Sequence, residues 1–377
     1  MGFPAFRKMF VLRPHSGYHG IMSETAAVEI SASASYGVQR IIWSFATDPR
    51  QRQLTTYSPV HDTGYTLEGL LASQDGLVLE KGRARGTMET EAVGAPPFDW
   101  LVPWWNADTA GKGFIEIFLQ AETEAGWSPW YPMGHWSQAA FSSSGGDGIA
   151  KVETDTLVLA SKAGRFKLRV ELSSGEDGGG DAILRRLGVI SRDRGMERPP
   201  TRHYLLQESS IPVPCRSQKI EAAGIRGRIC SPTCAAMALQ SHGIVLPTAF
   251  VAADCYDAGA KIYGNWPFNV ASLWRLGARA RLDFFPNMEM AAAVLASGRI
   301  LIASIKFAEG QLSGAPIHKT SGHLVLLTGL RKEKSGEFVV LVNDPAASHP
   351  EDVRRQYKLA EFESAWAGVA YVIEGRR

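Results

Sequence analysis

The feature that most constrains the fold is a change of hydrophobic period between the two halves of the chain. Residues 165–172 (RFKLRVEL) alternate strictly between apolar and polar side chains, and residues 113–122 (GFIEIFLQAE) place Ile115, Ile117, Leu119 and Ala121 on one side in the same way, as strands with one buried face do. In the second half, apolar segments of helical length alternate with short apolar runs. A chain of 377 residues is long enough for two domains. We therefore predict an N-terminal antiparallel β-sandwich followed by an α+β domain.

The predicted domain boundary lies in the polar, proline-containing stretch SRDRGMERPPTRH, which begins at Ser191. No amphipathic helix is expected before it, and the glycine-rich segment 173–181 is predicted to be a hairpin loop that leads into one last strand. The expected bounds are 1–190 for the β-sandwich domain, 191–208 for the linker and 209–377 for the second domain.

The second domain is predicted to hold helices at 232–242 and 288–297, which stop at Gly243 and Gly298. Three apolar runs, ILIASIKF, HLVLLTGL and EFVVLVND, are predicted to be strands, the last two joined by the turn-like RKEKSG. This pattern favours a leading helix followed by an antiparallel sheet.

Charge and hydropathy exclude several classes of function. The formal net charge is +2 and no basic run stands out, so we do not expect a nucleic-acid partner. The longest apolar run, near Ile300 to Ile305, is far too short to span a membrane. The N-terminal segment MGFPAFRKMFVLRPHSGYHG has no continuous apolar region and no cleavage site. We therefore predict no export signal and, by default, a cytoplasmic location.

The first domain is rich in tryptophan over a short stretch. Six of the ten tryptophans lie between positions 100 and 136: Trp100, Trp104, Trp105, Trp127, Trp130 and Trp136. Large aromatic side chains dominate core burial, so we interpret them chiefly as the core and rim of the sandwich. The alternative is a catalytically inactive binding protein whose β-sandwich takes carbohydrate or cell-wall material.

All four cysteines lie in the second domain, at Cys215, Cys230, Cys234 and Cys255, which is not the spread of a disulfide scaffold. Proline is favoured at the first helical position, so Pro232 in RICSPTCAAMAL is predicted to begin a helix. Cys230 then precedes the helix, where unpaired N–H groups and the helix dipole favour the thiolate. Cys234 lies one turn deeper and is predicted to pack as a small apolar group.

A thiolate nucleophile needs a base, and that base needs a group to orient it. His323 opens the apolar run HLVLLTGL, and Asp344 ends the run EFVVLVND. If these two strands form an antiparallel hairpin, both side chains lie at the same edge of the sheet. A Cys–His–Asp triad requires that arrangement.

These segments together resemble the papain-like cysteine peptidases of bacteria that process bacteriocin leaders, peptidase family thirty-nine in its "like" branch. The resemblance rests on RICSPTCAAMAL, SGHLVLLTGL, VVLVNDPAA and YGNWPFNVA, and FDWLVPWWNADT is similar to the β-rich N-terminal domain of the same proteins. It implies that Cys230 is the nucleophile, His323 the general base and acid, and Asp344 the residue that orients His323.

The resemblance also implies an oxyanion donor and a cleft. Gln218 in VPCRSQ matches the upstream glutamine of the family, although it lies 12 residues before the nucleophile, farther than is usual. Tyr263, Asn265 and Trp266 are candidates to line the substrate cleft, with packing an equal alternative. We expect a peptide or amide substrate, an acyl-enzyme intermediate and no cofactor.

A structural zinc site is the main rival of a different class. Cys230 and Cys234, with His318 and His323, have spacings that fit a Cys₂His₂ site. The long separation of the two pairs and the absence of a finger-like context argue against it. The sequence therefore favours a thiol hydrolase and leaves its substrate, and the choice between hydrolysis and acyl transfer, open.

Overall fold

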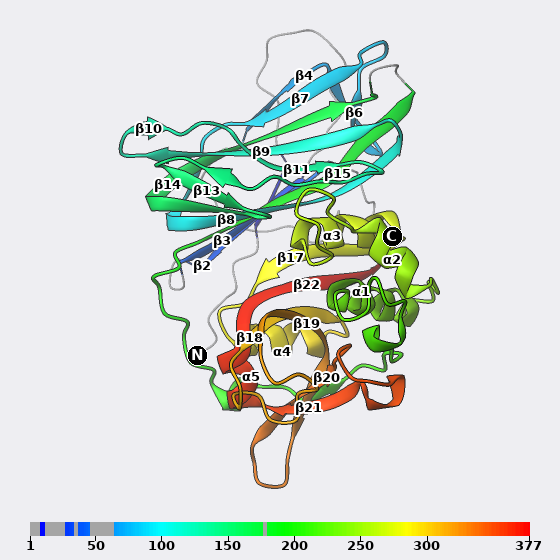
Figure 1. The fold of residues 1–377 in the computed structure, drawn as a ribbon. Coiled ribbons are helices and arrows are strands. Elements are labelled where there is room, and N and C mark those ends of the chain that lie inside the picture. The colour runs from blue at the N-terminus through cyan, green and yellow to red at the C-terminus, as the bar shows by residue number, and fades with distance from the viewer. Residues whose placement is uncertain (1–7, 12–26, 34–36, 46–63, 176–178) are drawn as a thin grey trace. The chain divides into compact units, whose positions relative to one another are not determined.

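The computed structural model describes residues 8–11, 27–33, 37–45, 64–175 and 179–377 (Figure 1). The chain divides into two compact units, which we describe separately. The N-terminal unit comprises Met1–Glu197 with Ala258–Ala260, and the C-terminal unit comprises Arg198–Asp257 with Lys261–Arg377. The division falls inside the stretch that was predicted to be a linker.

The N-terminal unit is built from antiparallel strands, and its described residues form no α-helix. The strands are β1 (Lys8–Val11), β2 (Ala27–Ser33), β3 (Val38–Ser44), β4 (Tyr65–Glu68), β5 (Leu70–Ser73), β6 (Gly76–Leu79), β7 (Arg85–Thr90), β8 (Val93–Gly111), β9 (Phe114–Thr123), β10 (Gly126–Trp127), β11 (Tyr131–Trp136), β12 (Gly145–Gly146), β13 (Ala150–Glu153), β14 (Thr156–Ser173) and β15 (Gly180–Arg192). The β-rich first domain is thereby confirmed, and its two-layer sandwich form stays a prediction.

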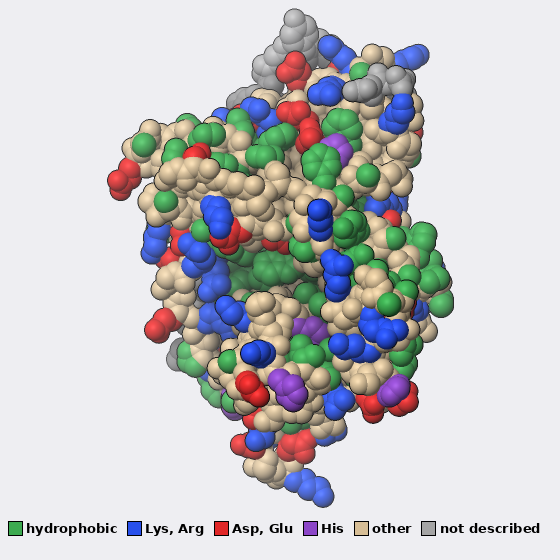
Figure 2. Space-filling view, viewed as in Figure 1, with side chains coloured by type: hydrophobic (Ala, Val, Ile, Leu, Met, Phe, Trp, Pro, Cys, Tyr) green, Lys and Arg blue, Asp and Glu red, His purple; other side chains and the backbone are tan. Residues whose placement is uncertain are grey.

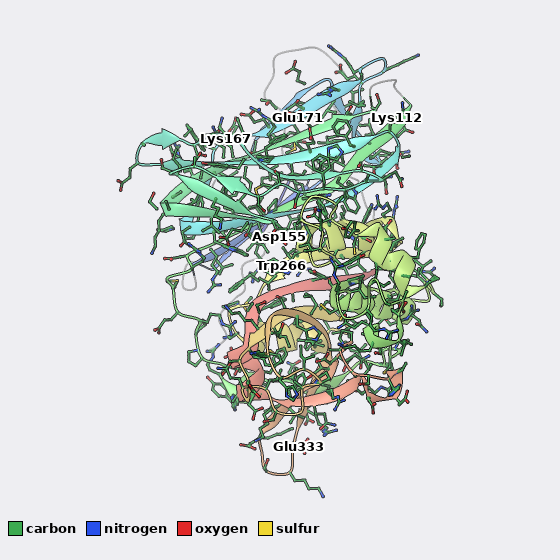
Figure 3. The ribbon with its side chains drawn as sticks, viewed as in Figure 1. Lys112, Asp155, Lys167, Glu171, Trp266 and Glu333 are labelled. Carbon is green, nitrogen blue, oxygen red and sulfur yellow. The ribbon has the colours of Figure 1, made fainter. Side chains whose placement is uncertain are left out.

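The alternating segments fold as their period predicts. β9 and β14 pair with Leu168 opposite Leu119. One face of each is buried: Ile115, Ile117, Leu119 and Ala121 on β9, and Phe166, Leu168, Val170 and Leu172 on β14. Phe114 and Phe118, on the other face of β9, are half-buried. Lys167 and Glu171 of β14 (Figure 3), at the alternate positions, are half-buried. One connection was predicted wrongly. The loop after β14 does not close a hairpin, because β15 pairs with β8 and β3, and β8 lies between β14 and β15.

The tryptophan cluster contributes mainly to the core. Trp104, Trp105 and Trp136 are at most 1% exposed, which confirms the packing interpretation for these three. Trp127 and Trp130 are partly exposed. The guanidinium carbon of Arg169 lies 4.2 Å from the Trp130 ring centroid, and Arg165 and Lys167 lie over Trp127 at 5.9 and 5.5 Å. Side chains of the same sheet therefore cover part of these ring faces.

The C-terminal unit is an antiparallel sheet with helices packed against it (Figure 1). The sheet order is β17-β22-β18-β19-β20-β21, with β16 paired to β19. The strands are β16 (Ser209–Ser210), β17 (Ala278–Phe284), β18 (Leu301–Phe307), β19 (Thr320–Lys332), β20 (Phe338–Asn343), β21 (Arg354–Lys358) and β22 (Trp366–Arg376). The helices are α1 (Cys230–Ser241), α2 (Thr248–Asp254), α3 (Trp266–Arg275), α4 (Met288–Ala296) and α5 (Leu359–Ala365), with short 3₁₀ turns η3 (His203–Leu205), η4 (Gln218–Ile220) and η5 (Pro350–Asp352).

The core of this unit lies between the sheet and the helices α4 and α5. Apolar residues of β18, β19, β20 and β22 pack there against Met288, Leu295 and Phe362. The three apolar runs predicted as strands are β18, β19 and β20, and the second predicted helix is α4. Among the described residues, no helix is long and apolar enough to cross a membrane.

Candidate active site

Helix α1 begins at Cys230, two residues earlier than the sequence predicted. Pro232 is therefore the third helical residue and not the first. The N–H groups of the first turn have no partner inside a helix, so proline is tolerated there without loss of a hydrogen bond. Cys230 is partly exposed, whereas residues 231–239 are buried. The thiol thus lies at the positive end of the helix dipole.

His323 and Asp344 come from two neighbouring antiparallel strands. β19 and β20 pair with Leu326 opposite Asn343, so His323 and Asp344 lie at the same edge of the hairpin. The Nε2 atom of His323 is 2.8 Å from Oδ1 of Asp344, and both side chains are almost fully buried. The juxtaposition expected from the sequence is present.

Asp344 is held by two further hydrogen bonds. The hydroxyl of Tyr357 on β21 donates to Oδ2 at 2.7 Å, and the N–H of Ala346 donates to Oδ1 at 2.9 Å. Burial alone would raise the pKa of the Asp344 carboxyl, but the charge and hydrogen bond of His323, together with these donors, bring the pKa below its usual range. The carboxylate is therefore ionised and fixed in place.

The imidazole of His323 also interacts with the Cys230 thiol. Because Nε2 faces Asp344, Nδ1 is the ring nitrogen left for the sulfur. Burial opposes ionisation of Cys230, but the His323 ring and the backbone N–H groups of Leu324 and Ser231 lower its pKa overall. Burial likewise opposes the charge of His323, but Asp344 and Cys230 raise its pKa to about 10. Both shifts favour a thiolate–imidazolium pair.

Cys234 has a different environment from Cys230. It is fully buried, as predicted, and its Sγ atom lies 3.5 Å from the carbonyl oxygen of Leu324. Burial, and then the neighbouring charges of Cys230 and Asp344, raise the pKa of the Cys234 thiol well above its ordinary value. Cys234 is therefore a neutral packing group, and all four cysteines are free thiols.

Gln218 contacts Ile229, the residue before Cys230, despite its long separation in sequence. Its side-chain Oε1 atom accepts a hydrogen bond from the backbone N–H of Ile229 at 3.0 Å, and its backbone N–H donates to the carbonyl of Pro345 at 2.9 Å. The intervening residues 219–228 turn out and back through η4 and the turns that follow it. The unusual spacing is thus an excursion of the chain. Within the described residues, the Nε2 atom of Gln218 makes no hydrogen bond.

The three candidate cleft residues occupy different environments. Asn265 is fully buried; its Oδ1 atom accepts from the N–H of Phe268 and caps α3, and its Nδ2 atom donates to Asp257 at 2.9 Å. Its amide groups are therefore used inside the fold, which does not suit a cleft residue. Tyr263 is partly exposed, and Trp266 is the half-buried first residue of α3 (Figure 3).

A buried polar network that the sequence did not indicate lies behind the nucleophile. The hydroxyl of Ser231 donates to Oδ1 of Asn269 at 2.8 Å and lies 2.9 Å from the hydroxyl of Tyr371. The Nδ2 atom of Asn269 in turn donates to the carbonyl of Tyr263 at 2.9 Å. This network ties the start of α1 to α3 and β22.

The ligand set proposed for zinc is not assembled. Within the part of the chain that the structure describes, no group of three or more His, Cys, Asp or Glu side chains is arranged to hold a metal ion. His323 is engaged by Asp344 and Cys230, and His318 is exposed.

Two family models match the chain. Residues 210–373 match the Peptidase C39 like family. The C-terminal unit is a peptidase C39-like domain. Residues 72–191 match the Peptidase C39 N-terminal domain, so the β-rich unit before the peptidase C39-like domain also has a family of its own. The family expected from the sequence motifs is confirmed.

Three solved structures show a weak likeness to this chain, and each alignment covers 45% of this chain. One is a double glycine motif protease from an AMS/PCAT transporter in complex with the leader peptide (17% identity, 96% of that chain, TM-score 0.30). Another is described as a C39-like peptidase from Bacillus anthracis (18% identity, 98% of that chain, TM-score 0.34). The third is the peptidase domain of Streptococcus ComA, a bi-functional ABC transporter (14% identity, 100% of that chain, TM-score 0.30). A search of curated proteins finds no match to the chain.

Proposed function

We propose that this protein is a cysteine peptidase that hydrolyses a peptide or amide bond through an acyl-enzyme. In this proposal Cys230 is the nucleophile, His323 the general acid and base, and Asp344 the residue that orients His323. The observation that carries the proposal is the His323 ring, which interacts with Asp344 through Nε2 and with the Cys230 thiol. Membership of the peptidase C39-like family supports the same activity.

The lowered pKa of Cys230 and the raised pKa of His323 define the first step. The Cys230 thiolate attacks the substrate carbonyl carbon, and its electron pair forms the carbon–sulfur bond. The imidazolium of His323 gives its Nδ1 proton to the leaving amine as the carbon–nitrogen bond breaks. Asp344 holds the other ring nitrogen, so the ring keeps the orientation that this transfer needs.

The tetrahedral oxyanion needs donors that are already in position. We assign this role to the Cys230 backbone N–H, at the open end of α1, and to Nε2 of Gln218. The bond from Ile229 to Oε1 fixes the orientation of the Gln218 amide and leaves Nε2 available. One such donor is typically worth about 10²–10³ in turnover. In the second half-reaction, neutral His323 takes a proton from water, whose oxygen attacks the thioester and releases Cys230.

The two neighbouring cysteines provide a matched test. Wild type, Cys230→Ala and Cys234→Ala should be treated with iodoacetamide or an epoxide probe at pH 7, and the modified residue mapped by mass spectrometry. We expect rapid labelling at Cys230, no rapid labelling in Cys230→Ala, and near-normal labelling in Cys234→Ala. Peptide-library hydrolysis should follow the same order. Equal reactivity of the two thiols would contradict the assignment, and rapid labelling without any turnover would favour an inactive binding protein.

A further inference from the structure

The segment between Gln218 and Cys230 carries an excess of positive charge. Lys219, Arg226 and Arg228 belong to this segment, and Lys261 lies against it, since its carbonyl accepts a hydrogen bond from Nη2 of Arg228 at 3.1 Å. The Nζ atom of Lys219 approaches the same segment, 3.5 Å from where a Cβ on Gly227 would lie. Figure 2 shows Lys and Arg side chains on the visible face of the C-terminal unit. Three of these cations belong to one short segment and the backbone of the fourth contacts it, so we refer to the four together as the basic cluster.

No carboxylate neutralises the basic cluster. Among the described residues, none of its four cations forms an ion pair, and Arg226 bonds only to the backbone carbonyl of Glu221. Glu221 is the one carboxylate in residues 219–229, too few to balance the cations, and its charge also acts on Arg216, outside the cluster. Asp257, the nearest carboxylate to Lys261 along the chain, is fully buried and bonded to Asn265. The cluster thus has uncompensated charge available for a partner.

Arg228 is the member of the cluster that is held by two contacts and that lies nearest to Cys230 along the chain. It lies two residues before Cys230, so their Cα atoms are at most about 7 Å apart. Its guanidinium carbon is 5.7 Å from the centroid of the Tyr263 ring, which itself packs on Tyr256 at 4.8 Å. This contact and the hydrogen bond to the Lys261 carbonyl hold the guanidinium, and within the described residues four of its five N–H groups have no partner.

A fixed guanidinium with free donors is suited to bidentate binding of a carboxylate. We propose that Arg228 and Lys261 form an anion subsite beside Cys230, which selects substrates with an Asp or Glu side chain next to the cleaved bond. This inference rests on the proposed function, because it names the substrate class of the same site. Tyr263 serves the subsite as the platform under Arg228 and has no role of its own in bond cleavage.

The first test does not require a substrate. Iodoacetate and iodoacetamide alkylate the same thiolate, but only iodoacetate carries a carboxylate. The ratio of their rate constants at Cys230 therefore reports the local positive charge and cancels changes in the pKa of the thiol. In Arg228→Gln we expect this ratio to fall about threefold to tenfold, the effect of removing one nearby charge. High salt should also lower the wild-type ratio, because it screens the attraction between the cluster and iodoacetate.

Arg331→Gln is the matched control. Arg331 is also an exposed arginine of the C-terminal unit, but it lies on the β19–β20 hairpin, paired with Glu333 (Figure 3) at 2.7 Å. The substitution changes the net charge equally, so its iodoacetate-to-iodoacetamide ratio should equal that of wild type. Lys261→Gln should lower the ratio, by less than Arg228→Gln. If the ratio in Arg228→Gln equals that in Arg331→Gln, there is no anion subsite.

The second test uses paired peptides that carry Glu or Gln on either side of the cleaved bond. Wild type should show a kcat/KM for the Glu peptide at least several-fold above that for the Gln peptide, and Arg228→Gln should remove most of this preference. Equal losses on both peptides would mean that Arg228 is structural and would overturn the subsite. Rapid labelling at a cysteine other than Cys230 would overturn the proposed function and the subsite together, whereas an unchanged ratio at a reactive Cys230 overturns the subsite alone.

Discussion

The chemistry of the site depends on how strongly Asp344 stabilises the imidazolium of His323. The pKa of His323 is raised above its ordinary value of 6.5, so the ring keeps its proton as the pH rises to about 10. In Asp344→Asn the charge is lost and the pKa of His323 falls, by about 1–3 units for an opposite charge at this range. The imidazolium then supports the Cys230 thiolate over a narrower range.

We therefore predict that, in the pH–rate profile of Cys230 alkylation, Asp344→Asn moves the rise on the acid side to higher pH. The sign follows because the pKa of Cys230 is lowered in part by the charge of His323, and a less persistent charge lowers it less. Rates of iodoacetamide labelling between pH 4 and 10 give this rise directly, with Cys234→Ala as a control. A rise at the same pH as in wild type would mean that His323 does not depend on Asp344 for its charge.

Tyr357 is a positioning residue that removal of one oxygen atom can test. Its hydroxyl is the donor to Oδ2 of Asp344, and Tyr357→Phe leaves a buried carboxylate oxygen without that partner. We expect a loss of about 1–3 kcal/mol in the free energy of unfolding. Urea denaturation measures this loss, and Tyr204→Phe, at a 79% exposed position, should show none.

The pH dependence separates this role from simple packing. The hydroxyl of Tyr357 helps to lower the pKa of Asp344 in the folded state. A carboxyl whose pKa is lower in the folded than in the unfolded protein stabilises the fold above the unfolded pKa, and this contribution is lost as the pH falls through the folded pKa. The stability gap between wild type and Tyr357→Phe should therefore narrow below about pH 4. A gap that is constant from pH 7 to pH 3 would contradict the assignment.

Local signals reveal some of these residues and not others. Cys230, His323 and Asp344 each flank an apolar segment, so their positions follow from where a helix or strand begins or ends. Tyr357 has no such signal, because its contact depends on the register of β20 with β21, which sets Val340 opposite it. The partners of Ser231, Asn269 and Tyr371, lie 38 and 140 residues away in sequence and have no local signal either.

At the level of elements, the first asparagine of the YGNWPFN segment fixes the start of α3. Asn265 caps this helix and also bonds the buried Asp257, whereas Asn287 caps α4 through one contact of 3.5 Å to the N–H of Met290. A lost asparagine cap costs about 0.5–2 kcal/mol. We predict that Asn265→Ala costs more than Asn287→Ala, by about 1 kcal/mol or more, since Asp257 also loses a partner. Denaturant unfolding of both variants compares them, and equal losses would mean that the hydrogen bond to Asp257 adds nothing to the stability that the cap provides.

The hydrophobic period of the sequence predicts helices and strands better than it predicts where they end and how they are connected. Alternation located the buried faces of β9 and β14, because a strand with one buried face permits few other patterns. The start of α1 was missed by two residues, because proline is accepted throughout the first helical turn and does not mark one position within it. The loop after β14 was misassigned, since a glycine-rich segment reports a turn and not which strand lies beyond it.

At the scale of the whole molecule, the C-terminal unit contains its own sheet, its own core and every residue of the proposed site. The structure also shows where this unit begins. Arg198 donates to the carbonyls of Trp366 at 2.6 Å and Glu363 at 3.0 Å, and Arg202 pairs with Glu289 at 2.8 Å. Residues that the sequence placed in the linker therefore pack on α4, α5 and β22.

We predict that residues 198–377 fold alone, unfold cooperatively and keep the fast labelling of Cys230. A second fragment that begins at residue 209, the domain start predicted from the sequence, should be less stable by about 1–3 kcal/mol, because it leaves the carbonyls of Trp366 and Glu363 without their donor. Urea unfolding of the two fragments side by side measures the difference, and labelling shows whether the site survives in each. Equal stability would show that residues 198–208 do not contribute to this unit, and an unfolded longer fragment would show that the unit depends on residues outside it.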